Sequence, residues 1–516
     1  MNKNFSRRDF LKLASLLPAA YYLPPSIKVL PASEEQTPPN ILVLIFDAWS
    51  IENTSLYGYP RKTTPNLDRL AEKAIVYHNH YVSGSFTYPS TSSLLTGVMP
   101  WTHWGYWNTP RSEILEEYSD KNIFSLFDSH YRYGHSNNIL ASDLIERMVS
   151  HMEAFLPAIK LAIPNHQWYQ SLFHKDPDTS IVSWSRELEL SEEGYANSLF
   201  LSRLYSHIRD KRQKNLSSLF PRGLPEISEK DNFILETEID WISDTLKTSK
   251  TPFFSYFHLL PPHSTYNTRW DFVDVFKDDG YEPLKKPFHP FSLSSQTYPV
   301  QKRNRRLYDE YILYADSEFG RLMENLRASG VLENTILILT SDHGEMFERG
   351  IREHLFPSFH EPQAHIPLLI FRPGQQERID IHDLTTTIDL LPTILQLSNK
   401  SFPDWLEGIV LPPFNPNVPK DRSVFGADFR YVPKFKPLAN GSVMLRKEQY
   451  KLTFLFGNYQ RYQNLGAPTL FALYDLENDP EEMKDLYHPQ SELSSSLLDE
   501  LLAKMDQVGL ELGVAL

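Results

Sequence analysis

Short apolar runs recur along the chain, and several of them are followed by acidic residues or histidines. The runs cover residues 41–46, 252–257, 335–340 and 366–371. Continuous apolar runs of this length predict strands that are buried on both faces, which is typical of a parallel sheet covered by helices. We therefore predict an α/β fold with a mostly parallel sheet sandwiched by helices.

The residues beyond these runs predict a metal site. Asp47 follows the first run, His263 lies beyond the second, and Asp342 and His343 follow the third. Open α/β sheets bind ligands at the carboxyl ends of their strands, so these side chains are expected to meet. Each residue alone is also typical of a helix cap or a surface position. Together they favour a divalent cation, because carboxylate oxygen and imidazole nitrogen are suitable ligands for one.

A hydroxyl-rich segment, residues 84–97, predicts a turn that enters a short helix. Pro89 is expected near the first helical position and Gly97 at the helix end. Thr87 would then place its hydroxyl at a helix N-terminus, where backbone N–H groups attract a sulfate or phosphate group. A plain Ser/Thr capping segment is the alternative.

The composition of the chain excludes several classes of function. The chain has 516 residues with 41% hydrophobic and 22% charged residues, which is ordinary globular usage. Its net charge of −14 argues against nucleic-acid binding, which needs a basic face. It contains no Cys, so disulfides, thiolate metal sites and a Cys nucleophile are excluded. Ca²⁺, Mn²⁺, Zn²⁺ and Mg²⁺ are the candidate metals.

The N-terminal segment resembles a bacterial Tat export signal. Arg7 and Arg8 precede a short apolar stretch, residues 13–23, which is shorter than the ~20 residues that span a bilayer. We predict a signal peptide over residues 1–33, the Tat machinery as a partner, and a periplasmic, extracellular or cell-surface location. An uncleaved anchor is the alternative.

Two parts are expected in the rest of the chain, and the first contains an insertion. Residues 34–395 are predicted to form the catalytic domain, with an insertion at about 110–250 that covers the site or merely adds packing. Residues 396–516 are predicted to form a C-terminal subdomain. Alternating apolar residues at 442–446 and 450–454 indicate a small antiparallel sheet there.

Seven segments carry motifs that occur together in one known family: Asn40–Asp47, Thr64–Ala71, Pro89–Gly97, Thr340–Glu345, His365–Ile370, Thr387–Thr393 and Leu473–Glu482. In this order they resemble the sulfatase family of the alkaline phosphatase superfamily. The resemblance covers most of residues 40–395 and part of 440–490. It implies that Asp47, Asp342 and His343 bind a divalent metal and that the nucleophile position, also a metal ligand, falls on Thr87.

Three departures from the family pattern change the expected mechanism. Typical members have a Cys or Ser, oxidised to formylglycine, at the nucleophile position and an Arg shortly after it. Thr87 cannot supply the aldehyde, and Thr91 cannot supply the guanidinium charge. Ala48 stands where many members have another metal-binding Asp. The chain thus looks similar to branches that use Thr: phosphoethanolamine transferases, lipoteichoic acid synthases and phosphodiesterases.

We therefore predict an exported, metal-dependent, sulfatase-like hydrolase of sulfate or phosphate esters with Thr87 as the nucleophile. His263 or His354 would protonate the leaving oxygen, and His360 and Asp316 are candidates for substrate contact or a second metal. The expected substrate is a sulfated or phosphorylated small molecule, glycan or lipid.

Two alternatives stay open. One is a phosphoethanolamine- or glycerophosphate-type transferase of the cell envelope. The other is a catalytically silent member that binds an anionic glycan. An active enzyme is favoured by the presence of Asp47, Asp342 and His343. A catalytically inactive protein is favoured by the absence of the Arg and of the second Asp.

Overall fold

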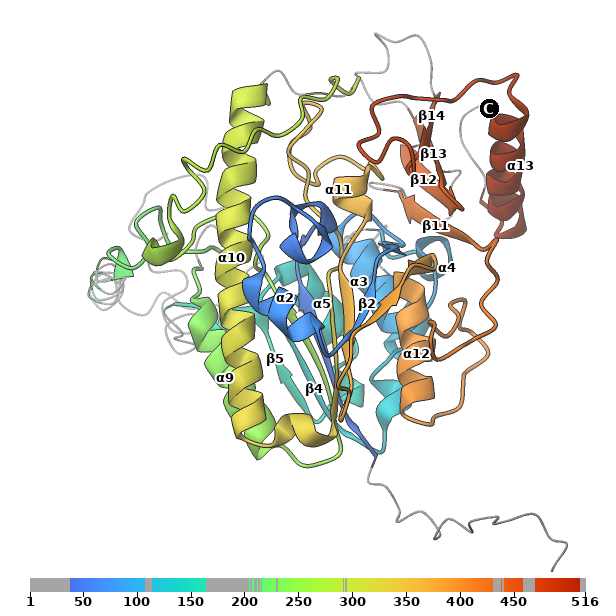
Figure 1. Ribbon diagram of the computed structural model, residues 1–516. Coiled ribbons are helices and arrows are strands. Elements are labelled where there is room, and N and C mark those ends of the chain that lie inside the picture. Colours follow the sequence, from blue (N-terminus) through green and yellow to red (C-terminus); the bar gives the residue numbers. More distant parts are fainter. Residues whose placement is uncertain are drawn as a thin grey trace, which may run out of the picture. The chain divides into compact units, whose positions relative to one another are not determined.

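The apolar runs form the centre of an eight-stranded sheet in the computed structural model of the protein. Strand β1 (Asn40–Phe46) lies between β6 (Phe253–Leu259) and β7 (Thr335–Thr340) and is parallel to both. Every residue of these three strands is buried, because helices cover both faces of the sheet (Figure 1). The predicted α/β fold with a mostly parallel sheet is confirmed.

The strand order is β5-β4-β6-β1-β7-β8-β2-β9. Strand β8 (Leu368–Phe371), expected from the run at 366–371, is antiparallel to both of its neighbours, which agrees with a sheet that is only mostly parallel. Parallel neighbours need a crossover that returns the chain to the starting edge. Between β7 and β8 the structure has only the four-residue helix α11 (Glu361–Ala364). The remaining strands are β5 (Ala154–Leu156), β4 (Tyr131–Ser136), β2 (Ile75–Tyr77) and β9 (Ile379–Ile381).

Two sets of helices cover the sheet. Alternate side chains of a strand point to opposite faces, and in β1 Leu42, Leu44 and Phe46 pack with the first set, whereas Ile41, Val43 and Ile45 pack with the second. The apolar run therefore has no polar face. The first set is α2 (Pro65–Ala71), α9 (Leu235–Thr248) and α10 (Tyr298–Ala328), and the second is α3 (Thr87–Thr96), α5 (Ile139–Glu146) and α12 (Leu390–Leu397).

Much of the segment at about 110–250 belongs to this core. It supplies strands β4 and β5 and helices α5 and α9, which corrects the prediction that the segment is an insertion. The first three residues of β4 and all of β5 are only partly buried. Strands near a sheet edge carry mixed side chains, so their sequence lacks the continuous apolar run that marks a central strand.

The predicted antiparallel sheet in the C-terminal part is confirmed. It has four strands in the order β11-β12-β13-β14, all antiparallel. Helix α13 packs against this sheet through Leu497, Leu501 and Met505, which share a cluster with Val443 and Phe454. The elements are β11 (Ser423–Asp428), β12 (Asn440–Lys447), β13 (Tyr450–Gly457), β14 (Thr469–Asp475) and α13 (Glu492–Gln507).

Shorter elements complete the fold. A two-stranded parallel sheet joins β3 (His80–Tyr81) to β10 (Thr385–Thr386), and α4 covers Pro100–His103. The 3-10 helices are Ile51–Asn53, Ser55–Tyr57, Glu116–Ser119, Ser125–Phe127, Val149–His151, Ala158–Leu161, Trp270–Phe272, Val331–Asn334 and Thr387–Asp389.

The structure describes residues 38–106, 114–163, 216–228, 231–290, 295–429, 440–457 and 469–510, together with positions 204, 207, 211, 214, 292 and 438. The predicted signal peptide at 1–33 lies outside the described residues. Within the described part, none of the helices has both the length and the apolar character that a membrane span requires.

Glu238 is a buried acidic residue of helix α9, which packs against one face of the sheet. Its side chain is 0% exposed, and its Oε2 accepts a hydrogen bond from Asn137 Nδ2 at 2.9 Å. Burial raises the pKa of Glu238 well above its usual 4.5, although the bond from Asn137 opposes the change. The folded protein therefore holds this proton at pH values where the unfolded chain has released it, so stability falls as pH rises above about 4.5.

Glu238→Gln is expected to remove this pH dependence. The free energy of unfolding of the variant should exceed that of the wild type by an amount that grows between pH 5 and pH 8, by at most about 1.4 kcal/mol per pH unit. Urea unfolding at both pH values measures the difference. Glu324→Gln, on the exposed surface of α10, is the control. A constant difference between Glu238→Gln and wild type across this range would contradict the prediction.

Candidate active site

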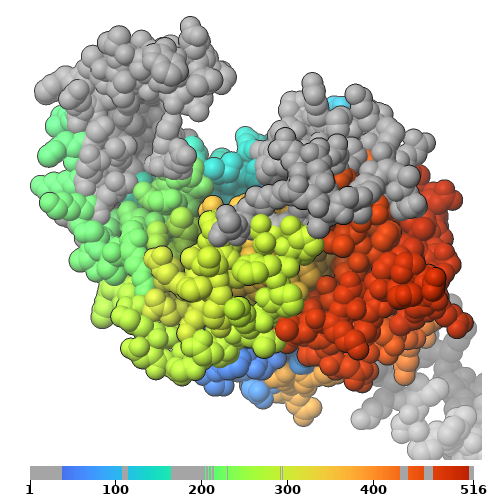
Figure 2. Space-filling view, turned by 90° about the horizontal axis from the view of Figure 1, so that it is seen from above, coloured from blue at the N-terminus to red at the C-terminus, as the bar shows by residue number. Residues whose placement is uncertain are grey.

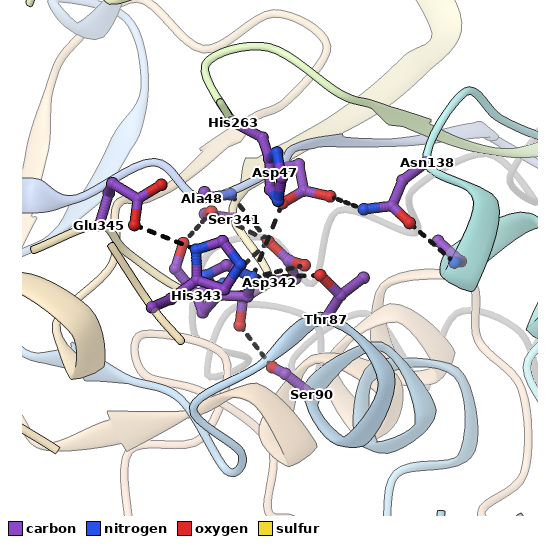
Figure 3. A network of polar contacts seen from close by, with 12 residues as sticks. Asp47, Ala48, Thr87, Ser90, Asn138, His263, Ser341, Asp342, His343 and Glu345 are labelled. Atoms are coloured by element: carbon purple, nitrogen blue, oxygen red, sulfur yellow. Dashed lines mark hydrogen bonds and ion pairs between the residues drawn. The ribbon is translucent and has the colours of Figure 1, made fainter. Parts of the chain in front are cut away.

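The carboxyl ends of four parallel strands bring together the polar side chains of the site (Figure 3). Asp47 follows β1, Asp342 and His343 follow β7, and Asn138 lies two residues after β4. His258 lies near the end of β6, opposite Ile45. Because these strands run in the same direction, their ends meet at one edge of the sheet.

Each carboxylate of the site has one oxygen held by donors and one oxygen without a hydrogen bond. Asp47 Oδ2 accepts from Asn138 Nδ2 at 2.5 Å and contacts His258 Nε2 at 3.1 Å. Asp342 Oδ1 accepts from the backbone N of Ala48 at 3.1 Å and of His343 at 2.9 Å. Among the described residues no donor reaches Asp47 Oδ1 or Asp342 Oδ2, and both side chains are 0% exposed.

The unprotonated nitrogen of His343 lies close to these two oxygens. Its Nδ1 lies 2.9 Å from the carbonyl oxygen of Gly344 and so carries the proton. Burial lowers the pKa of His343 to about 4, which keeps the ring neutral. Its Nε2 lies 3.7 Å from Asp47 Oδ1 and 3.5 Å from Asp342 Oδ2. Thr87 Oγ1 lies 3.2 Å from the same nitrogen.

These atoms fit a divalent cation. Ligand atoms of Asp47, Asp342 and His343 all lie within 4.8 Å of one another. Two buried carboxylates in contact are costly unless a positive charge lies between them. Burial and the charge of Asp47 raise the pKa of Asp342. Burial alone would raise the pKa of Asp47, but the charge of His263 and the hydrogen bond from His258 hold it below its usual value.

Thr87 is the first residue of helix α3, so the helix begins two residues earlier than the sequence predicts. Gly97 ends the helix with a φ of 72°, as predicted, whereas Pro89 is the third helical residue and not the first. Ser90 Oγ donates to the carbonyl oxygen of Asp342 at 2.5 Å. This bond links the helix that carries Thr87 to the loop after β7 that carries Asp342 and His343.

Two backbone positions allow the loops of the site to approach each other. A Cβ atom on Gly344 would lie 2.1 Å from the carbonyl oxygen of Pro362, so only glycine fits there. Ala48 has a φ of 59°, which is rare for a residue with a side chain. Many family members are expected to have an Asp at this position, whereas Ala48 offers only its backbone N–H, which donates to Asp342 Oδ1. Ala48 therefore helps to orient Asp342 but adds no carboxylate to the site.

Both histidines predicted as proton donors lie at this site. The rings of His263 and His354 are 4.8 Å apart, and His354 is 4.4 Å from His343. His263 Nδ1 lies 2.6 Å from the carbonyl oxygen of Ser264, so Nε2 is its nitrogen for proton exchange. Burial alone would lower the pKa of His263, but the charge of Asp47 raises it overall. His354 Nδ1 contacts Glu345 Oε1 at 3.0 Å.

The other two predicted residues have contacts outside this cluster. Asp316 accepts hydrogen bonds from Asn66 and from the backbone N of Leu67 at 2.8 to 3.0 Å, at the start of α2. These contacts account for its burial, and substrate contact by Asp316 stays a prediction. His360 contacts Glu482 at 3.1 Å and lines a separate cavity.

Three residues of the site are missing from the sequence prediction. His258 ends an apolar run, as Asp47 and Asp342 do, and this signal could have identified it. Asn138 follows β4, whose sequence does not resemble a central strand. Glu345 is buried behind His354, where burial raises its pKa to about 8. Nothing in the sequence around Glu345 reveals that burial.

Comparisons with known proteins agree with this arrangement. A family model described as Sulfatase matches residues 39–143 and 165–400. The chain belongs to the sulfatase family. The family model of the N-sulphoglucosamine sulphohydrolase C-terminal region matches residues 355–509. The predicted membership in the sulfatase family is confirmed, and with it the prediction of an ester hydrolase of that family.

Individual sulfatases and related proteins are similar at low identity. An arylsulfatase from Clostridium perfringens is 22% identical over 503 residues, which cover 88% of this chain and 91% of that protein. Arylsulfatase K from Bos taurus is 28% identical over 304 residues, 51% of this chain and 53% of that protein, so the match spans about half of its length. The structure of a phosphonate monoester hydrolase from Agrobacterium radiobacter aligns with a TM-score of 0.63 at 18% identity, covering 91% of this chain and 96% of that one.

Asn138→Ser is expected to weaken metal binding without unfolding the protein. Ser keeps an oxygen that can cap α5, where Asn138 Oδ1 accepts from Leu140 N, but it loses the amide that holds Asp47. Loss of such a supporting contact typically weakens metal affinity by about 10- to 100-fold. Titration with Mn²⁺ followed by calorimetry measures the dissociation constant.

Asn122→Ser is the matched control. Asn122 is buried and its side chain also accepts from backbone N–H groups, at Phe124 and Ser125, but it does not contact the site. Its Mn²⁺ affinity should equal that of the wild type. Equal affinities for both variants would mean that the contact between Asn138 and Asp47 does not support a metal site.

Proposed function

We propose that the protein is a metal-dependent hydrolase of sulfate or phosphate esters in which the Thr87 hydroxyl attacks the sulfur or phosphorus atom. The observation that carries the proposal is the convergence of Thr87 Oγ1, His343 Nε2 and two carboxylate oxygens that lack donors. Family membership supports the ester hydrolase. The names of its relatives, arylsulfatase and phosphonate monoester hydrolase, support both sulfur and phosphorus esters.

Asp47, Asp342, His343 and Thr87 would hold the cation. Oxygen ligands alone suit Ca²⁺ or Mg²⁺, whereas imidazole nitrogen suits transition metals, so we expect Mn²⁺ or Zn²⁺. A divalent cation at this position lowers the pKa of a hydroxyl that it touches and neutralises negative charge on the ester oxygens.

Thr87 is placed for the attack. Its Oγ1 would lose a proton, form a bond to sulfur or phosphorus in line with the leaving oxygen, and break the ester bond to that oxygen. The N-terminus of α3, a helix of 10 residues, adds partial positive charge beside the anion. Water would then hydrolyse the Thr87 ester, release sulfate or phosphate, and restore the hydroxyl.

His263 and His354 are placed to protonate the leaving oxygen. The His354 ring borders His343 and the His263 ring borders His354, and Nδ1 of each is already engaged, with Glu345 and Ser264 respectively. Nε2 is therefore the atom of each ring that would give a proton. The contact between Glu345 and Tyr266 at 3.1 Å orients this carboxyl, and so His354.

The two alternatives differ in measurable products. A transferase would pass the Thr87-bound group to an alcohol acceptor in place of water. A silent member would bind an anionic glycan without turnover. The buried, unpaired oxygens of Asp47 and Asp342 argue against a silent member, because glycan binding gives no reason to keep them at a site that is 0% exposed.

Thr87→Ala is expected to lower metal-dependent turnover on the order of 10³-fold or more, because it removes the attacking oxygen. Thr87→Ser keeps a hydroxyl and should retain turnover within about tenfold. The measurement compares aryl sulfate, aryl phosphate monoester and aryl phosphate diester after chelation and after addition of Mn²⁺, Zn²⁺ or Ca²⁺.

Thr91→Ala is the matched control, since Thr91 lies on the same helix and is equally buried. Full turnover by Thr87→Ala would contradict the assignment of Thr87 as the nucleophile. A metal-loaded wild type that binds an anionic glycan and turns over none of the esters would favour the silent alternative. Transfer of the bound group to an added alcohol, in preference to water, would favour the transferase.

We also propose export through the Tat route to the periplasm or beyond. Arg7 and Arg8 before a short apolar stretch support it, and Tat export is compatible with a protein that folds around a metal.

Replacing both Arg7 and Arg8 with Lys is expected to keep the protein in the cytoplasm of a Tat-competent bacterium, because the twin arginines are the feature that the export machinery reads. Cell fractionation and immunoblotting measure the location. Lys3→Gln, which removes a neighbouring positive charge, should leave export unchanged. Normal export of the double variant would contradict the Tat proposal.

A further inference from the structure

Gln363 of helix α11 is a buried amide beside the active site. The residue is 0% exposed. Its Nε2 donates hydrogen bonds to the carbonyl oxygens of Ser85 at 2.8 Å, Phe356 at 3.2 Å and His354 at 3.4 Å. Ser85 is 278 positions away from Gln363 in the sequence, on the segment that leads into α3. One side chain therefore joins the segment before the proposed nucleophile to the loop that carries a proposed proton donor.

The orientation of this amide is fixed by its partners. Carbonyl oxygens only accept hydrogen bonds, so the nitrogen of the amide faces Ser85, Phe356 and His354. Ser358 Oγ donates to Gln363 Oε1 at 2.7 Å and holds the other end. A glutamate at this position would turn an oxygen toward three carbonyl oxygens and could donate to none of them. The donor nitrogen is therefore the specific requirement of position 363.

The segment before Thr87 lies directly on helix α3. A Cβ atom on Gly84 would lie 2.8 Å from Pro89 Cβ, and Pro89 belongs to the first turn of that helix. Because the segment and the helix are in such close contact, a displacement of Ser85 also displaces the Thr87 hydroxyl. The hydrogen bond from Gln363 to Ser85 therefore acts on the position of the attacking oxygen.

The C-terminal subdomain also holds this segment. Asp428, the last residue of β11, accepts a hydrogen bond from Ser85 Oγ at 2.7 Å, and Ala427 N donates to the carbonyl oxygen of Ser83 at 2.8 Å. Figure 2 shows the C-terminal segments, in red, packed against the yellow-green part of the chain. These contacts remain when residue 363 is changed, so the segment should stay folded while its position relative to His354 changes.

The His354 ring depends on the same amide. Its centroid lies 4.4 Å from that of His343 and 5.8 Å from that of Phe86, the residue before Thr87. In an in-line displacement the attacking and leaving oxygens lie on opposite sides of the sulfur or phosphorus atom. A nucleophile and a proton donor on the two sides must therefore be held a fixed distance apart, and a displacement of about 1 Å can cost on the order of 100-fold in rate.

We propose that Gln363 is a positioning residue of the active site, which sets the distance between the Thr87 hydroxyl and the His354 imidazole. It acts through the backbone of Ser85 and His354 and not through contact with the reacting atoms. The inference rests on the proposed function and adds to it the residue that holds the two sides of the reaction in register.

Gln363→Glu tests the proposal, because it keeps the size of the side chain and replaces the donor with an acceptor. For a 4-nitrophenyl ester, whose leaving oxygen needs no proton, kcat is expected to fall on the order of tenfold, since Thr87 is displaced. For the phenyl ester of the same acid, kcat is expected to fall on the order of 100-fold, since displacement of His354 adds to the loss.

Metal binding separates positioning from a loss of folded protein. Within the described part of the chain, the side chain of Gln363 bonds to Ser85, His354, Phe356 and Ser358 and not to the metal-binding residues. Calorimetric titration of Gln363→Glu with Mn²⁺ should therefore give the stoichiometry of the wild type. Equal losses for the two esters with a reduced Mn²⁺ stoichiometry would mean partial unfolding and would overturn the proposal.

Gln301→Glu is the matched control. Gln301 is 5% exposed, and its Nε2 donates to the carbonyl oxygen of Ile351 at 3.4 Å, in the loop that carries His354. It places a buried carboxylate against the same loop, and its kcat should stay within about twofold of the wild type for both esters.

Ser358→Ala is a milder second variant. It keeps the amide of Gln363 but removes the hydroxyl that orients it, and a two- to fivefold loss of kcat, roughly, is expected for the phenyl ester. It tests the proposal even where Gln363→Glu does not fold. Turnover of both esters at the wild-type rate by Gln363→Glu, or by Ser358→Ala where the first variant does not fold, would overturn the proposal.

Binding of tungstate to the Mn²⁺-loaded protein keeps these outcomes separable from those of the proposed function. Tungstate is a tetrahedral oxyanion that needs no turnover, and Gln363→Glu is expected to weaken its binding about tenfold, because Thr87 and His354 border the same anion site. This loss in a protein whose wild type hydrolyses no ester would support the positioning role and refute the hydrolase. Wild-type hydrolysis that Gln363→Glu leaves unchanged would support the hydrolase and refute the positioning role.

Discussion

Two buried carboxylates that face the same point are the constraint around which this protein is organised. Asp47 and Asp342 are completely buried, and each keeps one oxygen without a donor. Burial of two such charges in contact is unfavourable unless a cation lies between them. The parallel arrangement of β1 and β7 brings the two residues together, and His343 adds a neutral nitrogen at the same point. Fold and chemistry are therefore linked through one electrostatic requirement.

The surrounding residues hold the ligands and do not add further charges. Asn138 and His258 hold one oxygen of Asp47, while backbone N–H groups hold one oxygen of Asp342. The backbone N–H of Ala48 donates to Asp342 Oδ1, and Thr87 Oγ1 lies beside His343 Nε2. In the proposed reaction the nucleophile is a hydroxyl, which requires activation by the cation or by a base.

The segment between β7 and β8 connects the parts of the active site. It carries Asp342, His343 and His354, and its Gln363 donates to the carbonyl oxygen of Ser85, two residues before Thr87. Gly344 lets this segment pack against α11 at a distance that a side chain would prevent. Asp342, His343 and His354 therefore depend on the packing of a single loop, whereas Asp47, Thr87 and His263 come from other parts of the chain.

The sequence alone determined the sheet, its central strands, and the residues that follow them, because strands buried on both faces must be continuously apolar and parallel strands end at one edge. It also determined the antiparallel C-terminal sheet, through alternation, and excluded a cysteine nucleophile. Only the tertiary structure decided the direction of β8, the place of β4 in the sheet, and the roles of Asn138, His258 and Glu345. These depend on contacts between residues far apart in the chain: Asn138 meets Asp47 across 91 positions, and no local pattern of side chains encodes which distant carboxylate an amide will reach.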